Sequence, residues 1–165
     1  MSLAIGLLAV VVVVIAQVSI LPAFSIFGVQ PNLVIVLLVA WMAVRGQREV
    51  LLLVPAAGLV QGLLDSQPLG LAMLALAPII LMTELRELRW AESDLVPALV
   101  LAALATLVYE TTILLTLAVT GEHLDWLASV LDVLVPAAIA NALLLLPVYG
   151  LIRLASLDLR HRQAL

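Results

Sequence analysis

Long apolar runs separated by short polar breaks extend along this chain from one end to the other. Most runs approach the roughly 20 residues that an α-helix needs to cross a bilayer, and the breaks carry prolines, glycines and charges that end helices. The pattern predicts an all-α integral membrane protein, a compact bundle of about six transmembrane helices forming a single transmembrane domain over residues 1–165. The predicted spans cover residues 3–21, 31–48, 50–64, 69–89, 95–120 and 131–152.

The middle of the chain gives the weakest span signals. Between residues 31 and 83 the individual apolar stretches are shorter than the roughly 17 residues usually needed to cross, so a re-entrant pair is an alternative there. The first run, from Leu3, lacks a basic n-region and a clear cleavage site, which favours a retained helix over a signal peptide.

The placement of arginine predicts an orientation. The seven basic residues fall in the second-to-third loop, the fourth-to-fifth loop and the C-terminal tail: Arg45, Arg48, Arg86, Arg89, Arg153, Arg160 and Arg162. With six spans, all these segments lie on one side of the membrane. Because cytoplasmic loops carry the excess of basic residues, we expect both termini in the cytoplasm.

Composition excludes several classes of function. Hydrophobic residues make up 65% of the chain and charged residues 11%, where soluble domains have about 25% charged residues. The net charge of −4 and the absence of a dense basic run argue against nucleic-acid binding. There is no cysteine, the two histidines fall on opposite sides of the predicted membrane, and no serine or threonine has a base nearby in sequence. We therefore expect no enzyme, cofactor, metal or small-molecule substrate, and a lipid-modifying enzyme is a weak alternative.

A few polar residues lie within the predicted spans, where a polar group needs a partner or a role. They include Gln17 in the first span, Gln61 in the third, Glu110 in the fifth and Asn141 in the sixth. The Glu110 side chain could tie its helix to Asn141 or Gln61, anchor a polar group of another protein, or serve as a proton or cation site.

Gly58 and Gly62 lie four residues apart on one face of the third predicted helix, where missing side chains allow close helix packing. This face either packs inside the bundle or receives a partner helix. Asp65 follows at the end of that helix, where its side chain could cap the next helix or accept a partner's hydrogen bond.

Four segments in fixed order carry a family resemblance: Gln30-Pro31-Asn32-Leu33, the Arg45-Gly46 turn, the run Gly58 to Asp65, and Pro68-Leu69-Gly70-Leu71. Together they resemble the rod shape-determining protein MreD family of bacterial inner-membrane proteins. Asn32 stands where that family has an aspartate, which keeps the helix-capping acceptor and removes a charge. The candidate residues for partner binding or packing are Pro31, Asn32, Gly58, Gly62, Asp65, Pro68 and Gly70.

The resemblance implies a non-enzymatic, multi-pass adaptor in the bacterial plasma membrane, within the elongation complex that organises peptidoglycan synthesis. Its implied partners are membrane lipids and the scaffold protein MreC, with RodA and a penicillin-binding transpeptidase as further candidates and MreB as an indirect partner. The alternative is the substrate-binding membrane subunit of an energy-coupling-factor vitamin transporter, also a compact six-helix protein. Such a carrier needs a cavity with several convergent polar groups, and the sequence offers Gln61, Tyr109, Glu110 and Asn141 at most.

Overall fold

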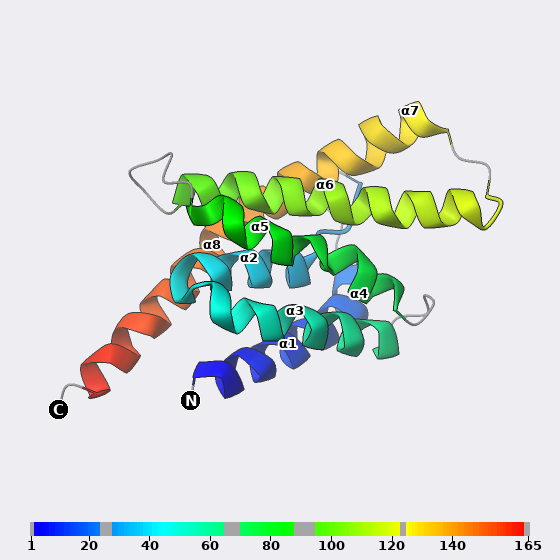
Figure 1. The fold of residues 1–165 in the computed structure, drawn as a ribbon. Coiled ribbons are helices and arrows are strands. Elements are labelled where there is room, and N and C mark those ends of the chain that lie inside the picture. Colours follow the sequence, from blue (N-terminus) through cyan, green and yellow to red (C-terminus); the bar gives the residue numbers. More distant parts are fainter. Residues whose placement is uncertain (1, 24–27, 65–69, 88–94, 123–124, 164–165) are drawn as a thin grey trace.

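The computed structural model describes residues 2–23, 28–64, 70–87, 95–122 and 125–163. Within these ranges the regular secondary structure is helical and contains no β-strand, which confirms the all-α prediction (Figure 1). The elements are α1 (Ser2–Ser19), η1 (Leu21–Ala23), α2 (Leu33–Arg45), α3 (Gln47–Leu64), α4 (Leu71–Leu76), α5 (Pro78–Glu87), α6 (Leu95–Val119), α7 (Trp126–Ser129), η2 (Val130–Leu134) and α8 (Val135–Gln163).

Four helical stretches within the described residues are long and apolar enough to cross a membrane. They are Leu3–Ala23, Gln47–Leu64, Leu95–Val119 and Trp126–Ser156. Two shorter apolar helical stretches, Leu33–Arg45 and Leu71–Met82, complete the six units. The shorter two fall in the region where the apolar runs of the sequence are also shortest.

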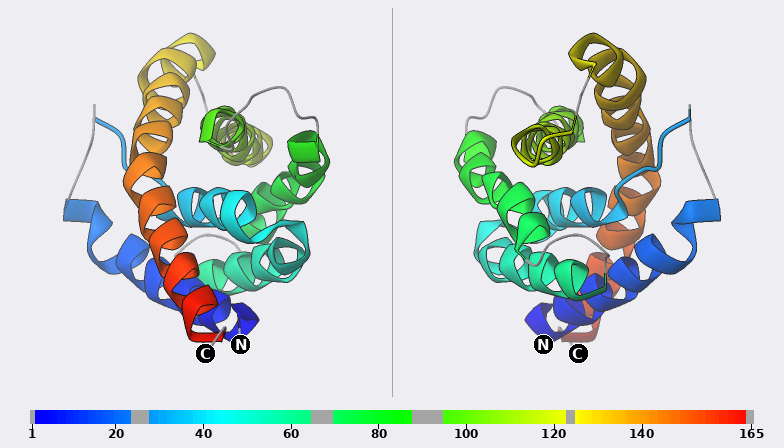
Figure 2. Two further views of the ribbon diagram at one scale, coloured as in Figure 1. Left: turned by 90° about the vertical axis from the view of Figure 1, so that its left-hand side faces the viewer. Right: turned by 90° about the vertical axis from the view of Figure 1, so that its right-hand side faces the viewer.

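Helix α2 lies at the centre of the bundle (Figure 2). Every residue from Val34 to Ala43 is buried, and the helix packs against α1, α3, α6 and α8. A helix that is apolar all round belongs inside a protein. With 13 residues, α2 is about 20 Å long, shorter than the roughly 30 Å hydrocarbon core. Its first turn therefore begins inside the bundle.

The turn between α2 and α3 depends on Gly46. Gly46 has φ of +98°, a backbone conformation that residues with a Cβ atom rarely adopt. Its N–H donates to the Met42 carbonyl (3.1 Å). Beside the turn, Trp41 Nε1 donates to Glu49 (2.8 Å), and the Arg45 guanidinium lies 5.7 Å from the Trp41 ring. These contacts connect the two helices at the end of α2 farthest from its first turn.

The fourth helical unit is interrupted at Ala77, between α4 and α5. Pro78 has no N–H to continue the helical hydrogen bonding, and proline favours the first turn of a helix. The interruption therefore follows directly from the sequence.

The last helix begins earlier than its apolar run predicts. Instead of starting at residue 131, helical structure starts at Trp126, because the Asp125 side chain accepts the N–H groups of Leu127 and Ala128 (3.1 and 3.2 Å). A π-helical segment, η2, then joins α7 to α8. The first residues of α1 and the last turns of α8 lie at the same end of the bundle (Figures 1 and 2).

Candidate functional site

Side chains from three parts of the chain form hydrogen bonds with the backbone at the start of α2. A helix start leaves backbone N–H groups without intrahelical acceptors. Asn32 meets two of them, since its Oδ1 accepts from Val34 N (3.1 Å) and Ile35 N (3.2 Å). Asn32 is only 6% exposed, so water does not replace these bonds.

Helix α1 supplies the next contacts through Gln17. The Gln17 Nε2 donates to the Pro31 carbonyl (3.1 Å), and its Oε1 accepts from Leu33 N (2.7 Å). Both ends of this amide thus bind the backbone that enters α2. Pro31 suits this position because it brings no N–H of its own.

Helix α8 contributes Asn141, which is completely buried. Its Oδ1 accepts from Asn32 N (2.7 Å), and its Nδ2 donates to Thr106 Oγ1 of α6 (2.8 Å). The Thr106 hydroxyl in turn donates to the Ala102 carbonyl (2.8 Å). The start of α2 is therefore bonded to α1 and α8, and through Asn141 to α6.

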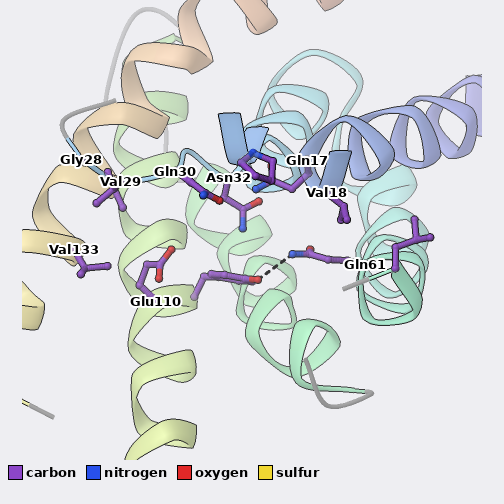
Figure 3. Close-up of a pocket in the computed structure, with 13 residues that line it drawn as sticks. Gln17, Val18, Gly28, Val29, Gln30, Asn32, Gln61, Glu110 and Val133 are labelled. Carbon is purple, nitrogen blue, oxygen red and sulfur yellow. Dashed lines mark hydrogen bonds between the residues drawn. The ribbon is translucent and has the colours of Figure 1, made fainter. Parts of the chain in front are cut away.

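A cavity of about 690 Å³ adjoins this helix start (Figure 3). Its volume lies within the range of roughly 300–1,000 Å³ that is typical of ligand sites. The polar residues that line it are Gln17, Gln30, Asn32, Gln61, Tyr109 and Glu110. The other lining residues are Val18, Pro22, Gly28, Val29, Leu64, Val133 and Ala137.

On the α3 side of the cavity, Gln61 is 3% exposed and only half satisfied. Its Nε2 donates to the Tyr109 hydroxyl of α6 (3.0 Å). Its Oε1 is buried and has no hydrogen-bond partner in the described part of the chain. Buried side-chain acceptors nearly always accept a hydrogen bond, so this oxygen lacks a donor that such atoms normally have.

Glu110 lies beside Tyr109 on α6, and its partly buried side chain lines the same cavity. In Figure 3 it extends into the space between α6 and the elements around it. The expected link from the fifth span to the sixth does exist, but Thr106 makes it, one helical turn before Glu110. Gln61 likewise bonds Tyr109. The Glu110 carboxylate is thus directed to the cavity and not to the two amides that sequence reasoning paired with it.

Gly58 and Gly62 face α4 within the bundle. A Cβ atom at Gly58 would lie 2.5 Å from the Met73 Cα, whereas one at Gly62 would lie 3.7 Å from its nearest neighbour, the Gly70 nitrogen. Gly70 itself precedes α4 with φ of +93°. The Gly58 contact is an internal packing contact, so substitution by a large residue is incompatible with the fold.

Two of the candidate residues, Asp65 and Pro68, lie outside the described residues. Sequence reasoning missed Gln30 as a lining residue and Thr106 as a partner of Asn141. The sequence contained a signal for Thr106 only. Thr106 precedes Glu110 by four residues, and residues four apart share one face of a helix, so Thr106 could have been expected beside Glu110.

Comparison with known protein families matches residues 1–155 to the family described as rod shape-determining protein MreD. No curated protein and no solved structure matches the chain. The match covers nearly all of the chain, including every element that bonds the start of α2 and lines the cavity. This membrane protein therefore belongs to the MreD family of rod shape-determining proteins.

Proposed function

We propose that this protein is a non-enzymatic adaptor of the bacterial inner membrane that binds the scaffold MreC and helps to organise peptidoglycan synthesis during elongation. Membership of the MreD family implies a role in rod shape determination. RodA and a penicillin-binding transpeptidase would join the same assembly, and MreB would act indirectly.

One observation carries the proposal: among the described residues, the cavity is lined by Gln61, a buried amide whose oxygen has no hydrogen-bond partner. A polar group in the membrane interior needs a partner. Gln17, Asn32 and Asn141 have theirs within the chain, whereas the Gln61 Oε1 has none in the described residues. The cavity therefore supports binding of an external group better than it supports a purely structural bundle.

The proposed orientation places both termini in the cytoplasm and the cavity toward the opposite side. Arg45 ends α2 at the far end from the cavity, and basic residues favour the cytoplasmic side. Leu64, the last residue of α3, lines the cavity, so the cavity lies near the end of α3 that points away from Arg45. A scaffold with one membrane span and an extracytoplasmic domain could reach this side.

The test is a mild-detergent pull-down of the tagged chain from its own host, with mass spectrometry of co-purifying proteins and of retained small molecules. We expect MreC among the recovered proteins, and its absence from a monodisperse preparation would contradict the adaptor proposal. An unrelated polytopic membrane protein with the same tag, extracted from the same host, controls for non-specific capture.

The second candidate is the substrate-binding subunit of an energy-coupling-factor transporter. The cavity favours it more than the sequence did, because six polar side chains line a space large enough for a vitamin-sized ligand. Recovery of a bound metabolite together with a pair of cytoplasmic ATPases would establish this function in place of the adaptor.

A further inference from the structure

The polar side chains around the start of α2 fall into two groups. Gln17, Asn32 and Asn141 accept backbone N–H groups inside the chain, which fixes the start of the helix. Gln61 and Glu110 instead line the cavity, and the Gln61 Oε1 is buried without a hydrogen-bond partner in the described chain. This second group contributes no bond to the start of α2. The Gln61 Nε2 links α3 to α6 through Tyr109, but that bond leaves the Gln61 Oε1 unpaired among the described residues.

The acceptors of the second group come from two different helices. Gln61 lies on α3 and Glu110 on α6, and both line the cavity. The Gln61 Oε1 is buried without a partner in the described chain, and an amide oxygen accepts hydrogen bonds but cannot donate them. The group that satisfies this oxygen must therefore donate.

The charges around the cavity limit the chemistry of the bound group further. None of the described residues that line the cavity is an arginine, lysine or histidine, so the Glu110 carboxylate has no basic neighbour there. Arg45, the basic residue of α2, lies over the Trp41 ring at the end of that helix farthest from the cavity. A carboxylate in a partly buried site is best matched by a cation that also donates hydrogen bonds.

We propose that the cavity is a socket for a basic side chain, arginine or lysine, carried by the membrane-proximal segment of the protein partner. This inference rests on the proposed adaptor function and names the chemistry of the contact. A guanidinium carries five N–H donors and no acceptor, and an ammonium carries three, so either supplies a positive charge for Glu110 and N–H donors for an unpaired acceptor such as the Gln61 oxygen. The cavity volume of about 690 Å³ leaves room for the neighbouring residues of the inserted segment.

The experiment measures binding of the purified full chain to full-length MreC in lipid nanodiscs. Glu110→Gln removes the charge and should weaken binding by about tenfold or more, as truncating a buried charge pair does. Gln61→Met removes the buried acceptor and should weaken binding severalfold. Asp132→Asn makes the same chemical change as Glu110→Gln at an exposed residue that does not line the cavity, and should leave binding unchanged.

Gln61→Met removes a buried unsatisfied oxygen but also the Nε2 bond to Tyr109, so the folding of this variant and of Glu110→Gln is checked by circular dichroism and monodispersity before binding is compared. Glu110→Lys should abolish binding, and replacing the matching basic residue of MreC by glutamate should restore it.

Native binding by both Glu110→Gln and Gln61→Met would overturn the socket while leaving the adaptor intact. Failure of the unaltered chain to bind MreC would instead overturn the adaptor and the socket with it. If the cavity holds a small amine instead of a side chain of MreC, the proposal of a protein occupant is wrong.

Discussion

Asn141→Leu should destabilise the bundle strongly without opening a cavity in it. Leucine has the same branching at Cγ as asparagine and is larger, so it leaves no void, but it cannot bond to Asn32 or Thr106. The substitution removes two hydrogen bonds from a side chain that is completely buried. It also leaves the Asn32 N–H, at the start of a buried helix, without its acceptor.

The expected magnitude follows from these bonds. Side-chain hydrogen bonds between membrane helices average about 0.6 kcal/mol and reach about 1.7 kcal/mol, so the two bonds contribute about 1–3 kcal/mol. A buried N–H left unpaired adds about 1–3 kcal/mol. Because these terms overlap, we expect the free energy of unfolding to fall by about 2–5 kcal/mol, a large part of the roughly 5–15 kcal/mol typical of a folded protein.

The assay is reversible unfolding in mixed micelles with increasing denaturing detergent, followed by circular dichroism. Thr106→Val is the matched variant, because it removes the acceptor of one Asn141 bond and keeps the side-chain shape. The two substitutions should be less than additive by the energy of their shared bond, about 0.6–1.7 kcal/mol. A change below about 0.5 kcal/mol for Asn141→Leu would refute the proposed role of this network.

Two further predictions compare matched positions in the same unfolding assay. Gly58→Ala should destabilise the bundle by about 1–3 kcal/mol, because its Cβ would lie 2.5 Å from the Met73 backbone. Gly62→Ala should be nearly neutral, because its Cβ would lie 3.7 Å from its nearest neighbour. Equal effects of the two substitutions on the free energy of unfolding would contradict the packing geometry. Asn32→Ala should cost about 2 kcal/mol, at the upper end for a helix cap, because two N–H groups lose their acceptor in a buried site. Asp125→Ala removes a cap of the same geometry at an exposed position, where water can replace the side chain, and should cost less than about 1 kcal/mol. A larger loss at Asp125 than at Asn32 would contradict this reasoning.

The order and nature of the helices were predictable because apolar runs and helix breakers are local features of the sequence. The fifth helix was expected over residues 95–120 and occupies Leu95–Val119. The last helix begins before the membrane span expected over residues 131–152, because Asp125 caps it at Trp126. A capping side chain begins a helix wherever its oxygen meets the first N–H groups, even before the strongly apolar residues.

The pairing of the polar side chains was not predictable, because it depends on which faces of the helices meet. Helix α6 is strongly apolar overall and its polar residues lie on more than one side, so its sequence pattern does not show which face turns inward. The Asn32 N–H finds its acceptor 109 residues away, in Asn141. Glu110 stood out as the one carboxylate within the fifth span, yet the link to α8 uses the less conspicuous Thr106.

The cavity follows from the short length of α2. A central helix of 13 residues cannot extend across the hydrocarbon core, so its first turn must lie inside the bundle. The backbone N–H groups of that turn need acceptors at a depth where water is scarce, and Gln17, Asn32 and Asn141 meet this need. Beyond the first turn, no part of α2 fills the space among the neighbouring helices, and α1, α3, α6 and η2 contribute residues to the walls of a cavity there. A full-length helix in place of α2 would occupy that space and cover Gln61 and Glu110, so the short helix and the proposed binding site are one structural feature.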